Sequence, residues 1–348
     1  MTDETMAGDH EAFDREAPPL VLIVILNWNN SEVTLASVAS VLQIGYPNFR
    51  MLLIDNGSSN GSAARLRTIR DDRVELLELS ENRGYTGGCN EGLRRALAMG
   101  AQYVWLLNSD ALVNDADTLK KLVSFAESDP KIGLVSPRIA ALGEEARITF
   151  CGGVCSMDPL IYDETCDPEQ ARCWARDYRN AGLALGTAML IKSSVIREIG
   201  MLDERFFMYF EDIDYSYRSS LAGYRNLVDE ESIVRHEEKN RNTNPTGMKP
   251  HYWYYMARNE CRFWRKHLGV FRSLRPSWWA FRRTLRHMLQ CRENRDATDA
   301  MLAGLWHGWI NRGGPYRPEY LMPRLLAAAI WKCMPATTAS SQPSGKGK

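Results

Sequence analysis

Short apolar runs recur along the first half of the chain, and each run ends abruptly in small polar or acidic residues. Residues 20–26 (LVLIVIL), 50–54 (RMLLI) and 103–107 (YVWLL) are such runs, and an Asn or Asp follows each of them directly. A continuous apolar run of this length is typical of a strand that is buried on both faces, because a solvated face would place polar residues at alternate positions. The sequence therefore predicts a sheet that helices cover on both sides.

Segments that can form helices lie between these runs. Ser31 can cap a helix that extends to about Gln43, and glycines 84, 87 and 88 precede an amphipathic segment that reaches Met99. The alternation of strand, loop and helix is the pattern of a doubly wound parallel sheet. Further strands are predicted at 74–79, 132–136 and 229–234, and another strand is entered through residues 186–188 within the ordered segment 182–191. Further helices are predicted at 117–128, 193–199 and 213–221, while residues 140–180 are left unassigned.

The polar residues that follow the strands form a first candidate site. The carboxyl ends of parallel strands meet at one edge of a sheet, where open α/β sheets bind their ligands. We expect Asp55, the glycine segment and Asp110 to lie side by side there, as a site for a divalent cation that holds a diphosphate. The simpler alternative is that residues 108–110 (NSD) form only a turn. No Walker loop and no G-x-G-x-x-G segment follows the first strand, which argues against a nicotinamide site.

A second candidate site lies in residues 206–214 (FFMYFEDID), where aromatic side chains flank three acids. Carboxylates among aromatic rings have raised pKa values unless a cation or a function holds them charged. Glu211 and Asp212 precede a predicted helix, so one alternative is an acidic helix start stabilised by the helix dipole. The other is a general base that accepts a hydroxyl proton. His236 follows the last predicted strand and is either a structural histidine or a metal ligand.

The last third of the chain is basic and aromatic. A helix is predicted to begin at His251, and between Arg258 and Arg295 there are 11 Lys/Arg and two Glu, interleaved with Trp, Phe and Leu. Three interpretations remain open for this region: a helix that lies on an anionic membrane, a surface for single-stranded nucleic acid, and a solvated face of a packed helix. The net charge of the whole chain is zero, which gives no general attraction to nucleic acid.

The two ends of the chain and its cysteines indicate an intracellular protein. Residues 1–18 are acidic without an apolar signal segment, and residues 335–348 are of low complexity, so we expect a disordered arm and a disordered tail. No apolar run approaches the roughly 18 residues that cross a bilayer. The eight cysteines are then expected to be reduced. Four of them, between Cys151 and Cys173, leave zinc binding open as an alternative to free thiols.

Six of these segments resemble, in the same order, those of the family-two inverting glycosyltransferases with the GT-A fold, and most closely the bacterial rhamnosyltransferases of cell-surface polysaccharide synthesis. The resemblance extends from about Leu20 to about His267 and implies a mixed, mainly parallel sheet with a C-terminal helical extension. We expect a catalytic domain at 19–245 and a helical region at 246–334. The segments are Val24–Asn29, Leu53–Ser58, Asn82–Asn90, Leu107–Asp110, Gly186–Leu190 and Phe207–Asp214.

The resemblance implies a role for individual residues. It places the nucleotide against Asn27, Asn29 and Asp55, and the diphosphate and sugar along Asn82 and Gly84. Asn108, as an oxygen ligand or a hydrogen bond to the ribose, and Gly186 belong to the same nucleotide-sugar site. It implies that Asp110 and His236 bind Mg²⁺ or Mn²⁺, and that Asp212, with Glu211 beside it, is the catalytic base. Asn108 departs from the family, which has an acid there, so the metal site carries one negative charge less.

The implied reaction transfers a sugar, with rhamnose as one candidate, from a dTDP- or UDP-linked donor. The acceptor is a hydroxyl of a glycan or of a lipid-linked molecule, and its choice depends on loops within residues 140–180. The protein is then expected in the cytoplasm, in contact with the anionic inner face of the plasma membrane, without a nucleic-acid partner. Two alternatives are a sugar-nucleotide pyrophosphorylase, disfavoured by residues 27–30 (NWNN), and a non-catalytic nucleotide- or RNA-binding protein that uses the basic region.

Overall fold

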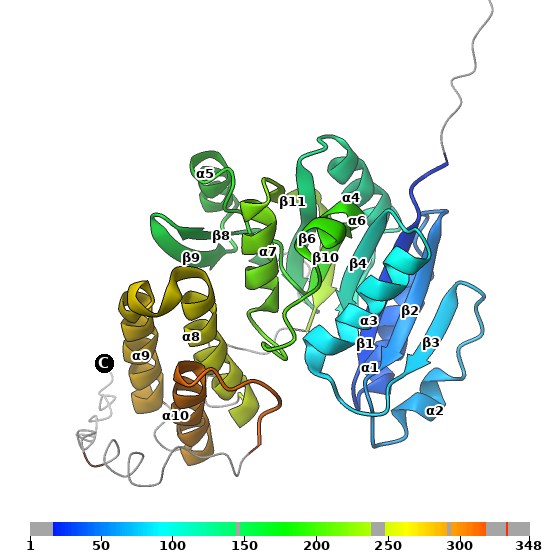
Figure 1. The fold of residues 1–348 in the computed structure, drawn as a ribbon. Helices are drawn as coiled ribbons and strands as arrows, with labels where there is room; N and C mark the ends of the chain where they lie inside the picture. The colour runs from blue at the N-terminus through cyan, green and yellow to red at the C-terminus, as the bar shows by residue number, and fades with distance from the viewer. Residues whose placement is uncertain (1–16, 144–146, 238–247, 291–293, 318–331, 333–348) are drawn as a thin grey trace, which may run out of the picture.

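A computed structural model describes residues 17–143, 147–237, 248–290, 294–317 and residue 332. It contains a curved sheet with helices on both faces, and a group of C-terminal helices packed beside it (Figure 1). The predicted arm at 1–18 and tail at 335–348 lie outside these residues except for Ala17 and Pro18.

The central sheet is mixed and mainly parallel, as predicted. Its strands follow the order β3-β2-β1-β4-β10-β6-β11-β5, and β7 pairs with β6. Strand β10 runs antiparallel to both of its neighbours, while β1, β2, β3 and β4 are parallel to one another. The strands are β1 Val21–Asn27, β2 Phe49–Asp55, β3 Val74–Glu78, β4 Tyr103–Asn108, β5 Ala111–Leu112, β6 Ile132–Ala141, β7 Ile148–Phe150, β10 Ala188–Lys192 and β11 Arg225–His236.

Helices cover both faces of this sheet, which explains the continuous apolar runs. Along β1, Ile23 belongs to one core cluster with side chains of α1 and α4, and Val24 belongs to a second cluster with side chains of α3, α6 and α7. Successive side chains of a strand point to opposite faces, so both sets must be apolar. The helices are α1 Ser31–Val41, α2 Ser62–Leu66, α3 Gly84–Ala98, α4 Thr118–Glu127, α6 Ser193–Ile199 and α7 Glu211–Leu221.

The structure differs from the sequence prediction at two places. The glycines expected to precede a helix lie inside α3, which begins at Gly84. The strand that Gly186–Ala188 was expected to enter is β10, as predicted. The unassigned segment forms a hairpin of β8 (Gly152–Met157) and β9 (Leu160–Thr165), followed by helix α5 (Pro168–Asp177). The glycines fit in α3 because their missing side chains let the helix lie close to β1: a Cβ at Gly88 would come 2.4 Å from Leu26.

In the C-terminal region, the described residues form α8 (Pro250–Arg272), α9 (Leu274–Gln290) and α10 (Arg295–Trp309). Helices α8 and α10 pack closely because α10 carries glycines at the contact: a Cβ at Gly304 would lie 2.3 Å from the carbonyl oxygen of Tyr254. In the part of the chain that the structure describes, no helix is both long and apolar enough to cross a membrane.

The cysteine cluster is dispersed over the hairpin region. Cys151 and Cys155 are buried, Cys166 is exposed and Cys173 is half-buried on α5. Within the described ranges, no three His, Cys, Asp or Glu side chains come together as a metal site. This arrangement gives no support to the zinc alternative, and all six cysteines in these ranges are free thiols.

Candidate active site

A cavity of about 500 Å³ opens at the carboxyl end of β4. The start of α7, the end of β11 and the loop before β10 form its other sides. It therefore collects residues from segments that are distant in sequence. Six of the predicted site residues line this cavity: Asn108, Asp110, Gly186, Glu211, Asp212 and His236.

Asp110 and His236 form the first pair in this cavity. Oδ1 of Asp110 lies 3.0 Å from Nε2 of His236, and the amide nitrogen of Asn108 lies 3.4 Å from the same ring atom. Strand β11 brings His236 to this point through its pairing with β5, in which His236 is opposite Ala111. Asp110, just after β4, and His236, the last residue of β11, thus meet at one edge of the sheet. This is the edge at which the sequence predicted Asp110.

The donor atoms of this pair fit a hard divalent cation. Adjacent ligands of an octahedral Mg²⁺, each about 2.1 Å from the ion, lie about 3 Å apart, which matches the separation of Asp110 Oδ1 and His236 Nε2. A carboxylate oxygen with an imidazole nitrogen also suits Mn²⁺. In the described residues, no third acid, histidine or cysteine joins the pair.

Asp212 is held at the start of α7 by two backbone amides. Its Oδ2 accepts a hydrogen bond from Gly186 N at 2.9 Å, and its Oδ1 accepts one from Ile213 N, also at 2.9 Å. The bond from Ile213 N is a local contact at the start of α7. Asp212 therefore also acts as the acidic residue at a helix start that the sequence offered as an alternative. Gly186 and the Asp212 side chain lie close together, because a Cβ on Gly186 would lie 3.1 Å from Oδ2 of Asp212. The half-buried carboxylate therefore has a fixed orientation in the cavity wall.

Glu211, beside it, is in a different electrostatic state. Its side chain is 7% exposed, and its Oε2 has no hydrogen-bond partner among the described residues. Burial, followed by the negative charge of Asp212, raises the pKa of Glu211 well above its ordinary value. Two adjacent carboxyl groups cannot both ionise cheaply in a desolvated site, so its surroundings favour the protonated form of Glu211.

The other five predicted residues lie outside this cavity. Both oxygens of Asp55 are occupied within the protein: Oδ1 accepts from Asn27 Nδ2 at 2.7 Å and from Ser58 Oγ at 2.6 Å, and Oδ2 accepts from Ser58 N. Asn29 joins the same two loops through Ser59 N. In the structure these side chains order the loops after β1 and β2.

Asn82 and Gly84 have a comparable local role. Oδ1 of Asn82 accepts from Gly84 N at 2.8 Å, which fixes the turn into α3. Gly84 has φ of +73°, and a Cβ there would come 2.5 Å from the carbonyl oxygen of Phe207. This position therefore requires glycine, because it combines a left-handed backbone with a close approach of another segment.

Sequence reasoning missed several residues that line the cavity. Tyr162 and Glu164 enter from the unassigned hairpin, and Met256 enters from α8. Tyr85 lies in the segment Asn82–Asn90 that carries the family resemblance, but the resemblance implied no role for it. Its hydroxyl donates to Gly186 O at 2.9 Å. The sequence did contain a signal for them: Tyr162 and Glu164 are two positions apart, and residues at this spacing face the same side of a strand.

A sequence profile described as Glycosyl transferase family 2 matches residues 22–200. A low-salt glycan biosynthesis hexosyltransferase of Haloferax volcanii is 28% identical over 214 residues, which cover 57% of this chain and 60% of that protein. A poly-beta-1,6-N-acetyl-D-glucosamine synthase of Staphylococcus aureus is 27% identical over 215 residues, covering 59% and 47%. The chain thus spans about half the length of the curated relatives it matches.

Two solved structures share the fold. A mannosyltransferase from Pyrobaculum calidifontis, in complex with GDP-Man and Mn²⁺, superposes with a TM-score of 0.53 at 17% identity, covering 90% of this chain and 80% of that one. GalNAc-T7 with UDP, GalNAc and Mn²⁺ superposes with a TM-score of 0.51 at 18% identity, covering 64% and 44%. At these identities the likeness establishes the GT-A type of fold for this chain.

The raised pKa of Glu211 predicts a pH-dependent cost to stability. The folded state binds the proton more tightly than the unfolded state, whose value is near the ordinary 4.5. The free energy of unfolding therefore falls as pH rises above that value, until the folded-state pKa is passed. We expect Glu211→Gln to gain in melting temperature relative to the unmodified protein as pH increases from 4.5. Thermal melts of both proteins across pH 4.5 to about 9 test this, and a constant difference between them would contradict it.

Proposed function

The chain belongs to glycosyl transferase family 2, and from this premise we propose that it transfers a sugar from a nucleotide-sugar donor to a hydroxyl group of a glycan or lipid-linked acceptor. The supporting observation is that one cavity contains both the Asp110–His236 pair and the Asp212–Glu211 pair. The first pair suits a cation that binds a diphosphate, and the second suits removal of a hydroxyl proton. A module that only binds nucleotide would need the first pair alone.

The donor is proposed to lie along the carboxyl edge of β1, β2 and β4. Asp110 and His236 would hold Mg²⁺ or Mn²⁺, with Asn108 beside them. Bound there, the cation would neutralise the charge of a diphosphate leaving group. The two solved structures with this fold contain GDP-Man or UDP together with Mn²⁺, which supports a nucleotide-diphosphate donor. The loops ordered by Asp55 are the proposed site of the nucleoside.

Asp212 is the proposed general base. Its two amide bonds orient it, and its half-buried position lets an acceptor hydroxyl reach it. Glu211 is less suitable, because its burial favours the protonated form. Asp212 would accept the hydroxyl proton as the oxygen attacks the anomeric carbon from the side opposite the diphosphate, which inverts the configuration in a single displacement. No covalent sugar intermediate is required in this scheme.

The identity of the sugar is a finer proposal. The resemblance noted from sequence favours rhamnose or another hexose carried by dTDP or UDP, and the relatives named above include a hexosyltransferase. Tyr162 and Glu164 of the β8–β9 hairpin line the cavity. We assign acceptor recognition to this hairpin because the proposed donor would take the sheet edge.

We also propose that α9 binds an anionic membrane. The structure corrects the view of residues 258–295 as one basic surface, since Arg258 and Arg262 are buried. The exposed part is narrower and combines apolar side chains with arginines. It consists of Phe271, Leu274, Trp278 and Trp279 with Arg272, Arg275, Arg282 and Arg286. Tryptophan beside arginine suits the lipid interface and its negative charge. Helix α9 lies at the outer edge of the molecule, as Figure 1 shows.

Binding of a nucleoside diphosphate should require a cation. A ligand that binds only the folded state stabilises it by about 2.7 kcal/mol at a hundredfold excess over Kd. We expect a rise in melting temperature for one of UDP, dTDP or GDP with Mn²⁺ or Mg²⁺, and loss of that rise with EDTA or in Asp110→Asn. Asp117→Asn, at the exposed start of α4, is the control. An equal rise in Asp110→Asn would place the cation elsewhere.

Replacement of the proposed base should separate catalysis from binding. Asp212→Asn keeps an oxygen for the Gly186 amide but cannot accept a proton. We expect the transfer rate to fall by about 10²–10⁴-fold, with nucleoside diphosphate affinity changed by less than about threefold. Transfer with each nucleotide sugar and affinity by calorimetry test this. Retained turnover would assign the base to another group, with Glu211→Gln as the next variant.

Membrane binding should depend on the exposed arginines of α9 and its neighbour. The fourfold change of Arg272, Arg275, Arg282 and Arg286 to Gln removes up to about 1 kcal/mol each. We expect the affinity for vesicles that contain anionic lipid, measured by co-sedimentation, to fall at least a hundredfold. The control is a matched fourfold change on the sheet domain, Arg65, Arg70, Arg94 and Arg197 to Gln. Equal loss in both proteins would contradict a specific surface, and loss of RNA binding without loss of vesicle binding would favour nucleic acid.

A further inference from the structure

The segment Phe206–Phe210, directly before the two carboxylates, has an unusual backbone. Phe207, Tyr209 and Phe210 have φ values of 67°, 67° and 70°, in the left-handed region, although none of them is glycine. Such residues cost on the order of 1–3 kcal/mol each and persist only where the surroundings hold them. The last of the three is the residue from which α7 begins, so the position of Asp212 depends on this strained segment.

Asn259 of α8 holds the segment by its backbone. Its Nδ2 lies 3.0 Å from the carbonyl oxygen of Phe206 and 2.8 Å from those of Met208 and Tyr209, so its two hydrogens are shared among three acceptors and one of them is bifurcated. The side chain is fully buried. A buried amide that serves three carbonyls of one short segment fixes the direction of each peptide unit, which is what a left-handed backbone needs.

Arg258 supports this arrangement from the adjacent position. Its Nε donates to Asn259 Oδ1 at 2.9 Å, which turns the Asn259 amide nitrogen toward the segment. Its Nη2 donates to Phe206 O, and its Nη1 donates to Gly314 O, both at 2.6 Å. The guanidinium also packs on the rings of Tyr254 and Tyr255. Full burial of an arginine is costly, and here its hydrogen bonds are made to the Asn259 side chain and to two backbone carbonyls.

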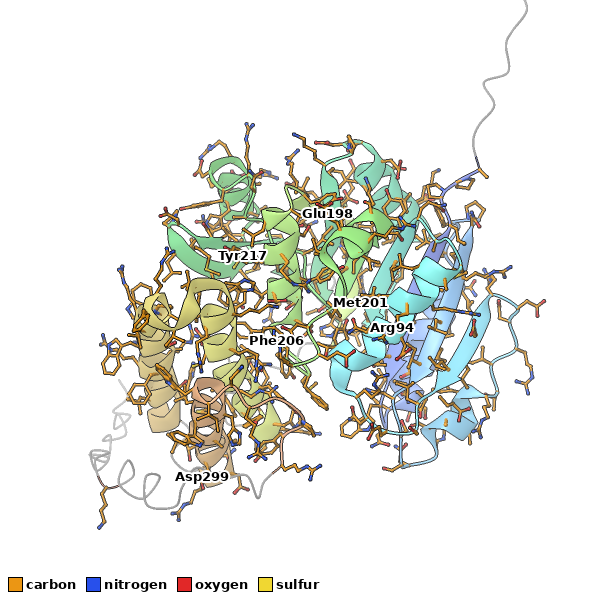
Figure 2. The ribbon with its side chains drawn as sticks, viewed as in Figure 1. Arg94, Glu198, Met201, Phe206, Tyr217 and Asp299 are labelled. Carbon is orange, nitrogen blue, oxygen red and sulfur yellow. The ribbon has the colours of Figure 1, made fainter. Side chains whose placement is uncertain are left out.

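The opposite side of the segment contacts α3. Thr86 N donates to Phe207 O at 3.2 Å, at the helix start where Gly84 permits close approach. The segment is therefore held between the proposed donor side of the sheet and the C-terminal helices. Figure 2 shows Phe206 at this boundary, between the sheet domain and α8.

A second tether secures α7 one half-turn beyond Asp212. The fully buried Asp214 accepts from His267 Nε2 at 2.8 Å, and Lys266 Nζ lies 2.7 Å from the same oxygen. Burial alone would raise the pKa of Asp214, but the hydrogen bond from His267 and the charges of Lys266 and Arg218 keep it below the ordinary value. Both ends of the Phe206–Asp214 stretch are thus attached to α8.

We propose that Arg258 and Asn259 are positioning residues, which set the place of the Asp212 carboxylate by holding Phe206–Phe210 in its strained form. The C-terminal helices are then part of the catalytic unit as well as a docking surface. This inference rests on the proposed function for its kinetic consequence, but the holding of the segment does not depend on it.

The test compares Asn259→Ala and Asn259→Asp with a control on the same helix. Asn259→Asp keeps the shape of the side chain but has no hydrogen to donate. The control is Arg262→Gln, since Arg262 is also buried but donates to Arg312 O instead of to the segment. Three quantities are measured in the full-length protein: amide hydrogen exchange of residues 206–214, affinity for the nucleoside diphosphate, and kcat and KM for transfer.

The amides of Met208 and Asp214 donate to carbonyl oxygens of the segment, those of Phe206 and Phe210. We expect hydrogen exchange at these two amides to be at least tenfold faster in both Asn259 variants than in the control. We expect kcat to fall about 10–100-fold, because a catalytic group displaced by about 1 Å loses that much, with KM for the donor and nucleoside diphosphate affinity changed less than threefold. A purely structural role would lower affinity, kcat and melting temperature together, as in any destabilised protein.

Unchanged exchange in the segment would overturn the proposal, and so would an unchanged kcat in a protein whose segment exchanges faster. If the Asn259 variants do not fold, Arg258→Lys provides the same test, because it keeps the buried charge but loses the bond that orients Asn259. Absence of transfer by the unmodified protein with every nucleotide sugar would instead refute the proposed function, and the exchange result would still decide whether Asn259 holds the segment.

Discussion

Burial of the central strands on both faces is the constraint on which the rest of the structure depends. Strands β1 and β4 place alternate side chains into two separate cores, so nearly every position is apolar until the strand leaves the sheet. Polar residues can then occur only at the strand ends, where backbone groups and water can satisfy them. Parallel pairing aligns these ends: Asn27 is opposite Asp55, and Leu26 is opposite Asn108. The concentration of polar chemistry at one edge follows from the packing of the sheet.

Electrostatics divides the carboxyl groups at this edge into distinct states. Asp55 is saturated by neutral donors, Asp214 is surrounded by cations, and Glu211 is buried with an unpartnered oxygen. Desolvation acts on each of them, and the outcome depends on whether enough donors or positive charges offset it. Asp212 alone combines fixed backbone donors with access to the cavity. This difference in surroundings, more than the residue type, is what selects it as the proposed base among neighbouring acids.

The C-terminal helices have two faces with opposite chemistry. The inner face of α8 uses Arg258, Asn259, Lys266 and His267 to bind the strained segment and α7. The outer face, on the end of α8 and on α9, exposes Phe271, which is 86% exposed, together with tryptophans and arginines. The same helices thus contact the strained segment before α7 and expose the surface proposed to bind a membrane. If both proposals hold, this region would orient Asp212 and bring it near a lipid-linked acceptor.

The sequence by itself determined the α/β fold, the buried strands and the candidate residues at the strand ends. These follow from local signals: the apolar runs, and the polar residues and glycines that end them. It also identified Asp110, His236, Glu211 and Asp212, which the structure brings into one cavity. The tertiary structure decided what local signals cannot carry. It showed that β10 reverses direction, that a hairpin from the unassigned segment enters the cavity, and that Asp55 is occupied within the protein. It also divided the basic region into buried and exposed arginines. An arginine that will face solvent and one that will hold a loop have the same local pattern, and only packing against a segment about 50 residues earlier distinguishes them.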